Sequence, residues 1–207
     1  MNTDEEQVEN LKIWLKENGP SIIVGIVVGI GGLIGYRYWV HLEEVSAEQA
    51  SRHYDQMMEA LDASDRDEVE LHAQQLISDH AKTEYAQIAR LALAKNFVEN
   101  GEFDEAQTNL EAVIDSGAQE PFALLARTRL AAVQLQTGQW DAALETLAID
   151  FPPEFTALVA ELRGDVYVQQ GENTMAIESY RAAQAASPGP ADPQFLQHKL
   201  TDLGVSG

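Results

Sequence analysis

The sequence of 207 residues contains no cysteine, which excludes disulfide bonds, thiol catalysis and cysteine metal sites. Basic residues are also scarce: 13 Lys and Arg stand against 34 Asp and Glu, and the formal net charge is −21. Because phosphate contacts need a basic surface, this charge excludes nucleic acid as a partner. Anionic lipid headgroups repel such a chain in the same way, so we expect its acidic part to stand off a membrane surface.

The motifs of common catalytic sites are missing as well. There is no HExxH zinc motif, no phosphate-binding glycine loop and no GxSxG elbow. Glu68 with His72, and His80 with Glu84, are pairs four residues apart, which we interpret as solvated surface pairs because no third group converges on them. The acidic run 62–68 lacks the glycine and the closing glutamate of an EF-hand loop. The sequence therefore predicts a protein that is not an enzyme and that binds no cofactor and no metal.

One long apolar run lies near the start of the chain. Residues 18–36 (NGPSIIVGIVVGIGGLIGY) carry no charge, and as a helix they are about 28 Å long, close to the hydrocarbon thickness of a bilayer. Aromatic and basic residues flank the run on both sides, as at two headgroup interfaces. They are Lys12, Trp14 and Lys16 before it, and Tyr36, Arg37, Tyr38 and Trp39 at its far end. The run predicts a transmembrane helix over residues 19–40.

Two other interpretations of this run stay open. One is a buried helix of a soluble protein, although such helices rarely extend this far without a polar face. The other is a cleavable signal peptide, which normally has a shorter apolar region and a basic leader, whereas residues 1–18 are acidic. We favour an uncleaved signal anchor with residues 1–18 as a short cytoplasmic leader. Two basic residues lie on each side of the run, so the charge count alone does not fix this orientation.

Small residues lie along one face of the predicted span. Gly25, Gly29 and Gly32 share this face, where a second membrane helix can approach closely. We predict that this face docks a membrane partner or a second copy of the chain. The alternative is that these glycines reflect only the general frequency of glycine in membrane helices.

A repeat in the middle of the chain is marked by three glycines, Gly101, Gly138 and Gly171, at spacings of 37 and 33 residues. Each has a small residue seven positions before it, an alanine five positions after it and a larger residue nine positions after it. In chain order these are Ala94, Ala131 and Gly164; Ala106, Ala143 and Ala176; and Leu110, Leu147 and Tyr180. The pattern predicts a helix, a tight turn with a positive φ at the glycine, and a second helix. Since one hairpin cannot bury its apolar face alone, we expect the hairpins to stack.

This pattern resembles the tetratricopeptide repeat, with departures at the position where that repeat has an early aromatic residue. Here that position holds Arg90, Arg127 and Ala160. We therefore predict three degenerate repeats over residues 85–186. The fold class is all-α: a single transmembrane helix, then a tetratricopeptide-like solenoid of helical hairpins with a C-terminal capping helix.

Two further segments complete this division of the chain. Residues 41–84 predict an atypical first hairpin, with helices over 46–61 and 69–80. Residues 187–207 predict a proline-rich linker and an amphipathic capping helix over 194–203, which keeps the last apolar face of the solenoid out of water.

The first helix of each hairpin lines the concave side of such a solenoid, and the register set by the glycines predicts which residues form it. They mix apolar and amide side chains with a few charges, which fits an extended polypeptide or a partner's helix. The predicted concave protein-binding surface consists of Ile88, Leu91, Lys95, Val98, Leu125, Thr128, Leu135, Gln136, Leu158, Glu161, Asp165 and Gln169. The alternative is that part of this surface packs inside a compact superhelix.

Short segments spread over the whole chain carry a second resemblance. They are ENG before the apolar run (residues 17–19), LIGYRYW at its end (33–39) and ELRGDV at the start of the last repeat (161–166). With these, the chain resembles the ancillary SecYEG translocon subunit family, also called YfgM-like.

The resemblance implies a single-pass protein of the bacterial inner membrane, with a cytoplasmic N-terminus and a periplasmic repeat domain. It also implies the partners: the SecYEG translocon, a membrane-anchored periplasmic chaperone related to peptidyl-prolyl isomerases, and unfolded exported polypeptides. The function so implied is to recruit that chaperone or to assist newly exported proteins. The alternative function is a structural scaffold that assembles envelope protein complexes and has no part in export.

Overall fold

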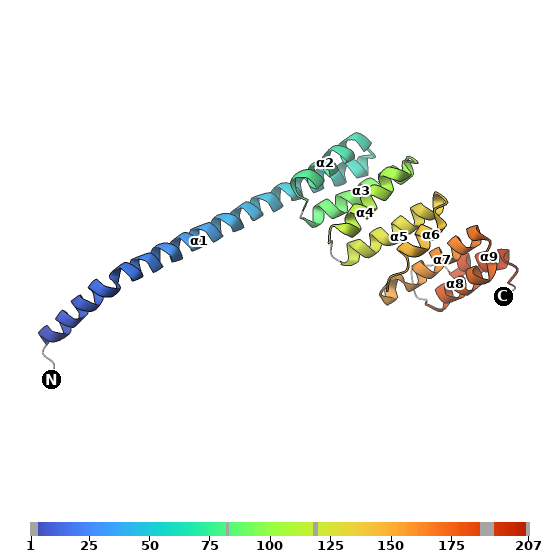
Figure 1. Ribbon diagram of the computed structural model, residues 1–207. Coiled ribbons are helices and arrows are strands. Elements are labelled where there is room, and N and C mark those ends of the chain that lie inside the picture. Colours follow the sequence, from blue (N-terminus) through green and yellow to red (C-terminus); the bar gives the residue numbers. More distant parts are fainter. Residues whose placement is uncertain (1–3, 82, 118–119, 187–192, 206–207) are drawn as a thin grey trace. The chain divides into compact units, whose positions relative to one another are not determined.

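The computed structural model describes residues 4–81, 83–117, 120–186 and 193–205. Every regular element in these ranges is a helix, as the sequence predicts (Figure 1). The chain divides into two compact units, Met1–Gln49 and Ala50–Gly207.

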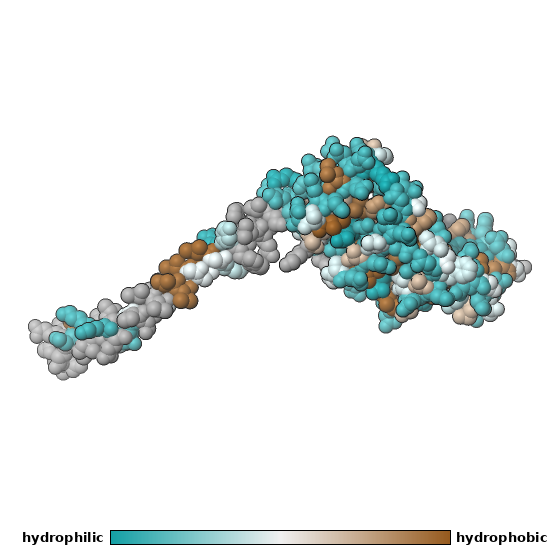
Figure 2. Space-filling model, turned by 45° about the horizontal axis from the view of Figure 1, so that its top comes forward, coloured by the Kyte–Doolittle hydropathy of each residue, from teal (hydrophilic) through white to brown (hydrophobic). Residues whose placement is uncertain are grey.

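The first unit is the N-terminal part of α1 (Asp4–Ala63), a helix of 60 residues that contains the whole apolar run. Figure 2 shows a strongly apolar patch on this helix, where several large side chains are more than half exposed. They are Val27, Val28, Ile30, Leu33 and Ile34. Within the described part of the chain, no helix has an apolar stretch long enough to span a bilayer. The transmembrane anchor over residues 19–40 stays a prediction.

The expected start of a separate helix at Ser46 is wrong. In the structure, residues 46–61 are the last part of α1, which continues from the apolar run without a break. The reason lies in the sequence: no glycine or proline stands between Gly35 and Ser46, so nothing there interrupts the helical hydrogen bonds.

The second unit is a succession of helical hairpins, which follow one another from α2 to α9 in Figure 1. The end of α1 pairs with α2 through buried side chains of both helices. Each later helix contacts the one before it, and α5 also contacts α3 and α7, so the first helices of the hairpins form a continuous layer. The elements are α2 (Arg66–Asp79), α3 (Glu84–Glu99), α4 (Phe103–Asp115), α5 (Glu120–Gln136), α6 (Trp140–Thr146), the short 3₁₀ turn η1 (Pro153–Phe155), α7 (Thr156–Gln170), α8 (Asn173–Ala185) and α9 (Pro193–Asp202).

The predicted glycine turns are confirmed. Gly101, Gly138 and Gly171 have φ values of +77°, +77° and +78°. After each of them, the next backbone N–H donates to a carbonyl five residues back, as Glu102 does to Phe97 at 2.8 Å. This bond satisfies a carbonyl that the end of the first helix leaves free.

The first hairpin uses the same turn without a glycine. Ser64 has a φ of 57°, and the N–H of Asp65 donates to the carbonyl of Ala60 at 2.9 Å. The Asp65 side chain then accepts a hydrogen bond from the N–H of Glu68 and caps α2. A search for turn glycines cannot find this hairpin, because serine occupies the left-handed position.

The small and large positions of the repeat form its core. Ala106, Ala143 and Ala176 are fully buried, and so are the larger residues Leu110, Leu147 and Tyr180. Ala94 and Ala131 are buried opposite leucines, whereas the third repeat pairs Gly164 with the larger Tyr180. A Cβ added to Gly164 would lie 2.4 Å from Cε1 of Tyr180. Glycine is therefore required there, because the tyrosine ring takes the volume that an alanine methyl group occupies in the other repeats.

Candidate partner-binding surface

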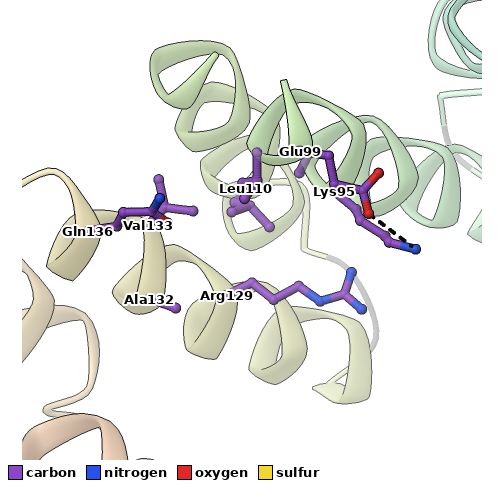
Figure 3. A pocket seen from close by; sticks show the side chains of 9 residues that line it. Lys95, Glu99, Leu110, Arg129, Ala132, Val133 and Gln136 are labelled. Atoms are coloured by element: carbon purple, nitrogen blue, oxygen red, sulfur yellow. Dashed lines mark ion pairs between the residues drawn. The ribbon is translucent and has the colours of Figure 1, made fainter. Parts of the chain in front are cut away.

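A cavity of about 310 Å³ opens between the hairpins α3–α4 and α5–α6. Figure 3 shows side chains of α3 and α5 on its two sides, with Leu110 of α4 between them. We call it the α3–α5 groove. Its lining consists of Ala94, Lys95, Val98, Glu99, Leu110, Arg129, Ala132, Val133 and Gln136.

The floor of the α3–α5 groove is aliphatic because it is the outer surface of a core cluster. Ala94, Leu110 and Val133 all belong to this cluster and are buried. Ala132, by contrast, is exposed on the α5 wall, and its short side chain leaves the space above the floor open. An occupant that inserts an apolar side chain would remove this floor from water.

The rim of the groove is polar and carries two cations. Lys95 pairs with Glu99 at 3.6 Å, with the two side chains 66% and 61% exposed. Arg129 Nη1 donates to the carbonyl of Leu91 at 3.4 Å. Desolvation lowers the pKa of Arg129 from its ordinary value, but a guanidinium stays charged at neutral pH. In Figure 3 the charged ends of Lys95 and Arg129 extend toward the same end of the groove, away from Gln136.

The structure brings part of the predicted concave surface together here and removes another part. Lys95, Val98 and Gln136 line the groove. Leu91 and Thr128, by contrast, are only 5% and 3% exposed, so their assignment to an accessible surface is wrong. Leu91 packs in the core cluster, and the hydroxyl of Thr128 donates to the carbonyl of Leu125 at 3.0 Å. Neither residue lines the groove.

The other positions on the predicted surface differ in burial. Gln169 is exposed, whereas four apolar residues are half-buried, and three of these pack against core clusters. The half-buried residues are Ile88, Leu125, Leu135 and Leu158.

Glu161 and Asp165 do not form an open surface, because the terminal helix α9 covers them. Lys199 of α9 places Nζ 2.8 Å from Glu161 Oε1 and 2.6 Å from Asp165 Oδ1. The Tyr180 hydroxyl donates to the same Asp165 oxygen at 2.7 Å. Burial, followed by this hydrogen bond, raises the pKa of Tyr180 above its ordinary range. The assignment of these two carboxylates to the binding surface is therefore corrected: the chain's own C-terminal helix occupies them.

A cluster of histidines in the first hairpin was not predicted. The ring centroid of His53 lies 5.8 Å from that of His72 and 6.2 Å from that of His80. His80 is buried, so its interpretation as part of a solvated pair is wrong, whereas His72 does lie 3.3 Å from Glu68. Among the described residues, no group of histidine and acidic side chains is arranged to hold a metal ion. Sequence periodicity cannot find this cluster, because it brings His53 of α1 together with His72 of α2 and His80, which directly follows α2.

The small-residue face of the first unit is open. A Cβ added to Gly25, Gly29 or Gly32 would meet no atom within 4 Å. Docking of a second helix on this face stays a prediction.

Comparison with known proteins then decides the family. The family model for the tetratricopeptide repeat-like domain matches residues 12–205. A relative from Haemophilus influenzae is 34% identical over 200 residues, which cover 97% of each chain. One from Escherichia coli is 32% identical over 202 residues, covering 98% of this chain and 97% of the relative. Both relatives, and a third from Aggregatibacter actinomycetemcomitans at 31% identity, carry the name "Ancillary SecYEG translocon subunit".

This chain belongs to the ancillary SecYEG translocon subunit family. The family match extends over nearly the full length, so the resemblance indicated by the three short segments is confirmed. In this member of the ancillary SecYEG translocon subunit family, the α3–α5 groove lies within the matched repeat-like domain.

Proposed function

We propose that this chain is an ancillary subunit of the SecYEG translocon, and that it holds a partner-binding repeat domain beside the channel. The observation that carries the proposal is the family relationship: proteins named for this role match 97–98% of the chain. In this proposal the chain binds partner proteins and does not catalyse a reaction. The repeat-like domain supports this, because stacked helical repeats provide extended binding surfaces. The described cavities are lined mainly by side chains on the surfaces of the helices.

The N-terminal helix supplies the location in this proposal. Residues 19–40 anchor the chain in the inner membrane, with the leader 1–18 in the cytoplasm and the repeat domain in the periplasm. The uncharged run 18–36 and its exposed aliphatic side chains support an anchor of this kind. A reporter enzyme that is active only outside the cytoplasm, fused after Gly207, should be active; activity of a cytoplasm-specific reporter alone would reverse the orientation.

The repeat domain supplies the binding surface. A periplasmic chaperone of the peptidyl-prolyl isomerase type and newly exported polypeptides are the partners that we propose for it. The open α3–α5 groove, with an aliphatic floor and a charged rim, supports binding of a polypeptide segment.

Association with the channel can be tested through the small-residue face of α1. Tagged full-length chain is purified from membranes in mild detergent, and co-purified SecY, SecE and SecG are quantified. We expect Gly25→Leu combined with Gly29→Leu to lower their yield, because the added side chains keep a second helix at a distance. The matched control is Gly31→Leu with Gly35→Leu, two glycines with the same spacing on another face of the same helix.

Two outcomes of this experiment contradict the proposal. If the wild-type chain brings down no channel subunit, the association with the translocon is wrong. If other envelope complexes co-purify in its place, the scaffold alternative holds. An equal loss in both double variants would instead exclude the Gly25 face as the docking surface.

A further inference from the structure

Two cations of the repeat unit stand on the rim of the α3–α5 groove. The whole chain has a formal charge of −21, yet two of its 13 basic residues, Lys95 and Arg129, line one cavity. Elsewhere, Arg66 lies 2.7 Å from Glu102, and Lys199 lies between Glu161 and Asp165. Those two cations are held by carboxylates of the chain itself.

Arg129 differs from them in its partner. Its Nη1 donates to the carbonyl of Leu91 at 3.4 Å, and it forms no ion pair with a carboxylate of the described residues. A guanidinium has five N–H donors in a planar fork that matches a carboxylate. Among the described residues, Lys95 forms an ion pair with Glu99 alone, and this pair is so exposed that solvent weakens it. Both cations on the rim can therefore bind a carboxylate of a partner.

The last repeat of the same solenoid shows an occupied face of opposite polarity. There, Glu161 and Asp165 of α7 hold Lys199, while Leu196 and Leu200 of the same helix α9 are buried in the adjacent core cluster. Helix α9 thus covers the last hairpin with a charged side chain, Lys199, next to two buried leucines. In the α3–α5 groove two cations, Lys95 and Arg129, stand on the rim with one carboxylate, Glu99, so the rim has an excess of positive charge. Among the described residues, only α3, α4 and α5 line the groove.

We propose that the α3–α5 groove binds a partner segment in which a large aliphatic side chain stands next to an Asp or Glu side chain. The aliphatic group lies over Leu110 and Val133, and the carboxylate binds Arg129 and Lys95. This inference rests on the proposed partner-binding function and specifies its ligand.

The carboxylate comes from a side chain rather than from a chain terminus. Terminal carboxylates are typically held by free backbone N–H groups in a nest. All lining residues of the groove lie within α3, α4 and α5, where the backbone N–H groups beyond the first turn are used by the helix itself.

The experiment measures fluorescence anisotropy of labelled peptides with the full chain in zwitterionic nanodiscs. The probe alternates pairs of Leu and Glu and is acetylated and amidated, so that only side chains supply carboxylates. One comparison peptide replaces Glu by Lys, and another replaces Leu by Ser. We expect the Leu–Glu peptide to bind about tenfold more tightly than either comparison peptide, and its affinity to fall with salt.

Two variants locate the site on the chain. We expect Arg129→Gln to weaken the Leu–Glu peptide about fivefold or more, whereas Arg181→Gln, which removes the same charge from exposed α8, leaves it unchanged. Ala132→Leu fills the cavity and should weaken binding similarly, whereas Ala182→Leu on α8 should not. Helicity and thermal midpoint, measured by circular dichroism, establish that each variant is folded.

The outcomes separate this inference from the translocon proposal. Equal binding of the Leu–Glu and Leu–Lys peptides, or unchanged binding to both Arg129→Gln and Ala132→Leu, overturns the inference even if SecYEG subunits still co-purify. Selective binding of the Leu–Glu peptide by a chain that brings down no channel subunit supports the inference and refutes the translocon association.

Discussion

At the turns between paired helices, a single residue in the left-handed region lets the chain reverse. Gly101, Gly138 and Gly171 adopt this conformation at little cost, because they have no Cβ. Ser64 adopts it in the first hairpin with a Cβ present, and a non-glycine residue there is strained by about 1 kcal/mol. The same backbone hydrogen bond thus closes the three glycine turns and the Ser64 turn, and the Ser64 turn carries the strain of a Cβ in the left-handed region.

We expect Ser64→Gly to stabilise the second unit by about 0.5–1 kcal/mol, because it removes the Cβ strain and keeps the turn bond of Asp65. The urea midpoint of the full chain in micelles, followed by circular dichroism, measures this change. Gly101→Ser makes the reverse substitution at an equivalent turn and should destabilise the chain. A lower midpoint for Ser64→Gly would contradict the interpretation.

Gly164 and Tyr180 give a second prediction at this scale. We expect Gly164→Ala to cost about 1–2 kcal/mol, because the new methyl group meets the buried ring at 2.4 Å. In a Tyr180→Leu background, which restores the Ala–Leu pair of the other repeats, the same substitution should cost much less. A double-mutant cycle of unfolding free energies measures the coupling, and a coupling near zero would show that the ring does not exclude the methyl group.

Tyr180 also makes stability depend on pH at the alkaline end. Burial and the hydrogen bond to Asp165 raise its pKa, so the folded chain keeps the phenol proton where the unfolded chain releases it, above about pH 10. This contribution is complete below that pH and is lost as the pH rises further, by up to about 1.4 kcal/mol per pH unit. Urea unfolding at several alkaline pH values should give a smaller slope for Tyr180→Phe than for the wild type. Identical slopes would contradict the prediction.

At the level of the helices, α9 decides where the open part of the solenoid ends. Its Leu196 and Leu200 are buried against the last hairpin, while Phe195 is exposed. Lys199 fastens the helix through Glu161 and Asp165, and its Nζ lies 4.6 Å from the centroid of the Phe195 ring. The side chains of Lys199 and Glu161 are 17% and 15% exposed, so this pair is only weakly screened by solvent.

We expect Lys199→Gln to destabilise the second unit by about 2 kcal/mol, because two neighbouring carboxylates then lose their common cation. Lys95→Gln is the matched control, since it breaks an exposed pair and should cost less than about 0.5 kcal/mol. Thermal unfolding of the full chain compares the two variants. Equal effects would mean that the contact of α9 with α7 contributes no more than a surface ion pair.

The helical hairpins could be predicted from the sequence, but part of the site could not. The repeated glycines and alanines report local geometry, so the turns and the buried small positions followed from their spacing. Arg129 was not predicted as a site residue, because its role depends on α3 and α5 lying side by side. The contact that shows this joins Arg129 to Leu91, 38 positions away in the chain. Glu161 and Asp165 were misassigned for the same reason: periodicity shows the face of a helix but not the distant helix that covers it.

For the molecule as a whole, the described hydrophobic core and the proposed membrane anchor lie in different segments of the chain. The four buried clusters draw on side chains from Ala50 to Val205, within the second unit. The uncharged run 18–36 belongs to the first unit, and none of its described residues is in these clusters. Membrane attachment, as we propose it, is therefore separable from folding of the repeat unit.

We expect a chain without residues 1–40 to leave the membrane fraction and to keep the thermal midpoint of the second unit, because no clustered core residue is removed. Fractionation after a carbonate wash and circular dichroism measure the two properties. The full chain, which should stay in the membrane pellet, is the control. Its release by the same wash would contradict the anchor, and a collapse of the midpoint would contradict the separation.

The contact of Lys199 with two carboxylates of α7 also makes the two ends of the solenoid unequal as places to add a repeat. An additional hairpin appended after α8 would displace α9, and Glu161 and Asp165 would then lose Lys199 as their cation. A duplicated hairpin inserted upstream of α7 meets no such obstacle. Growth of this architecture, whether by gene duplication or by design, is therefore confined to the stretch that precedes its last repeat.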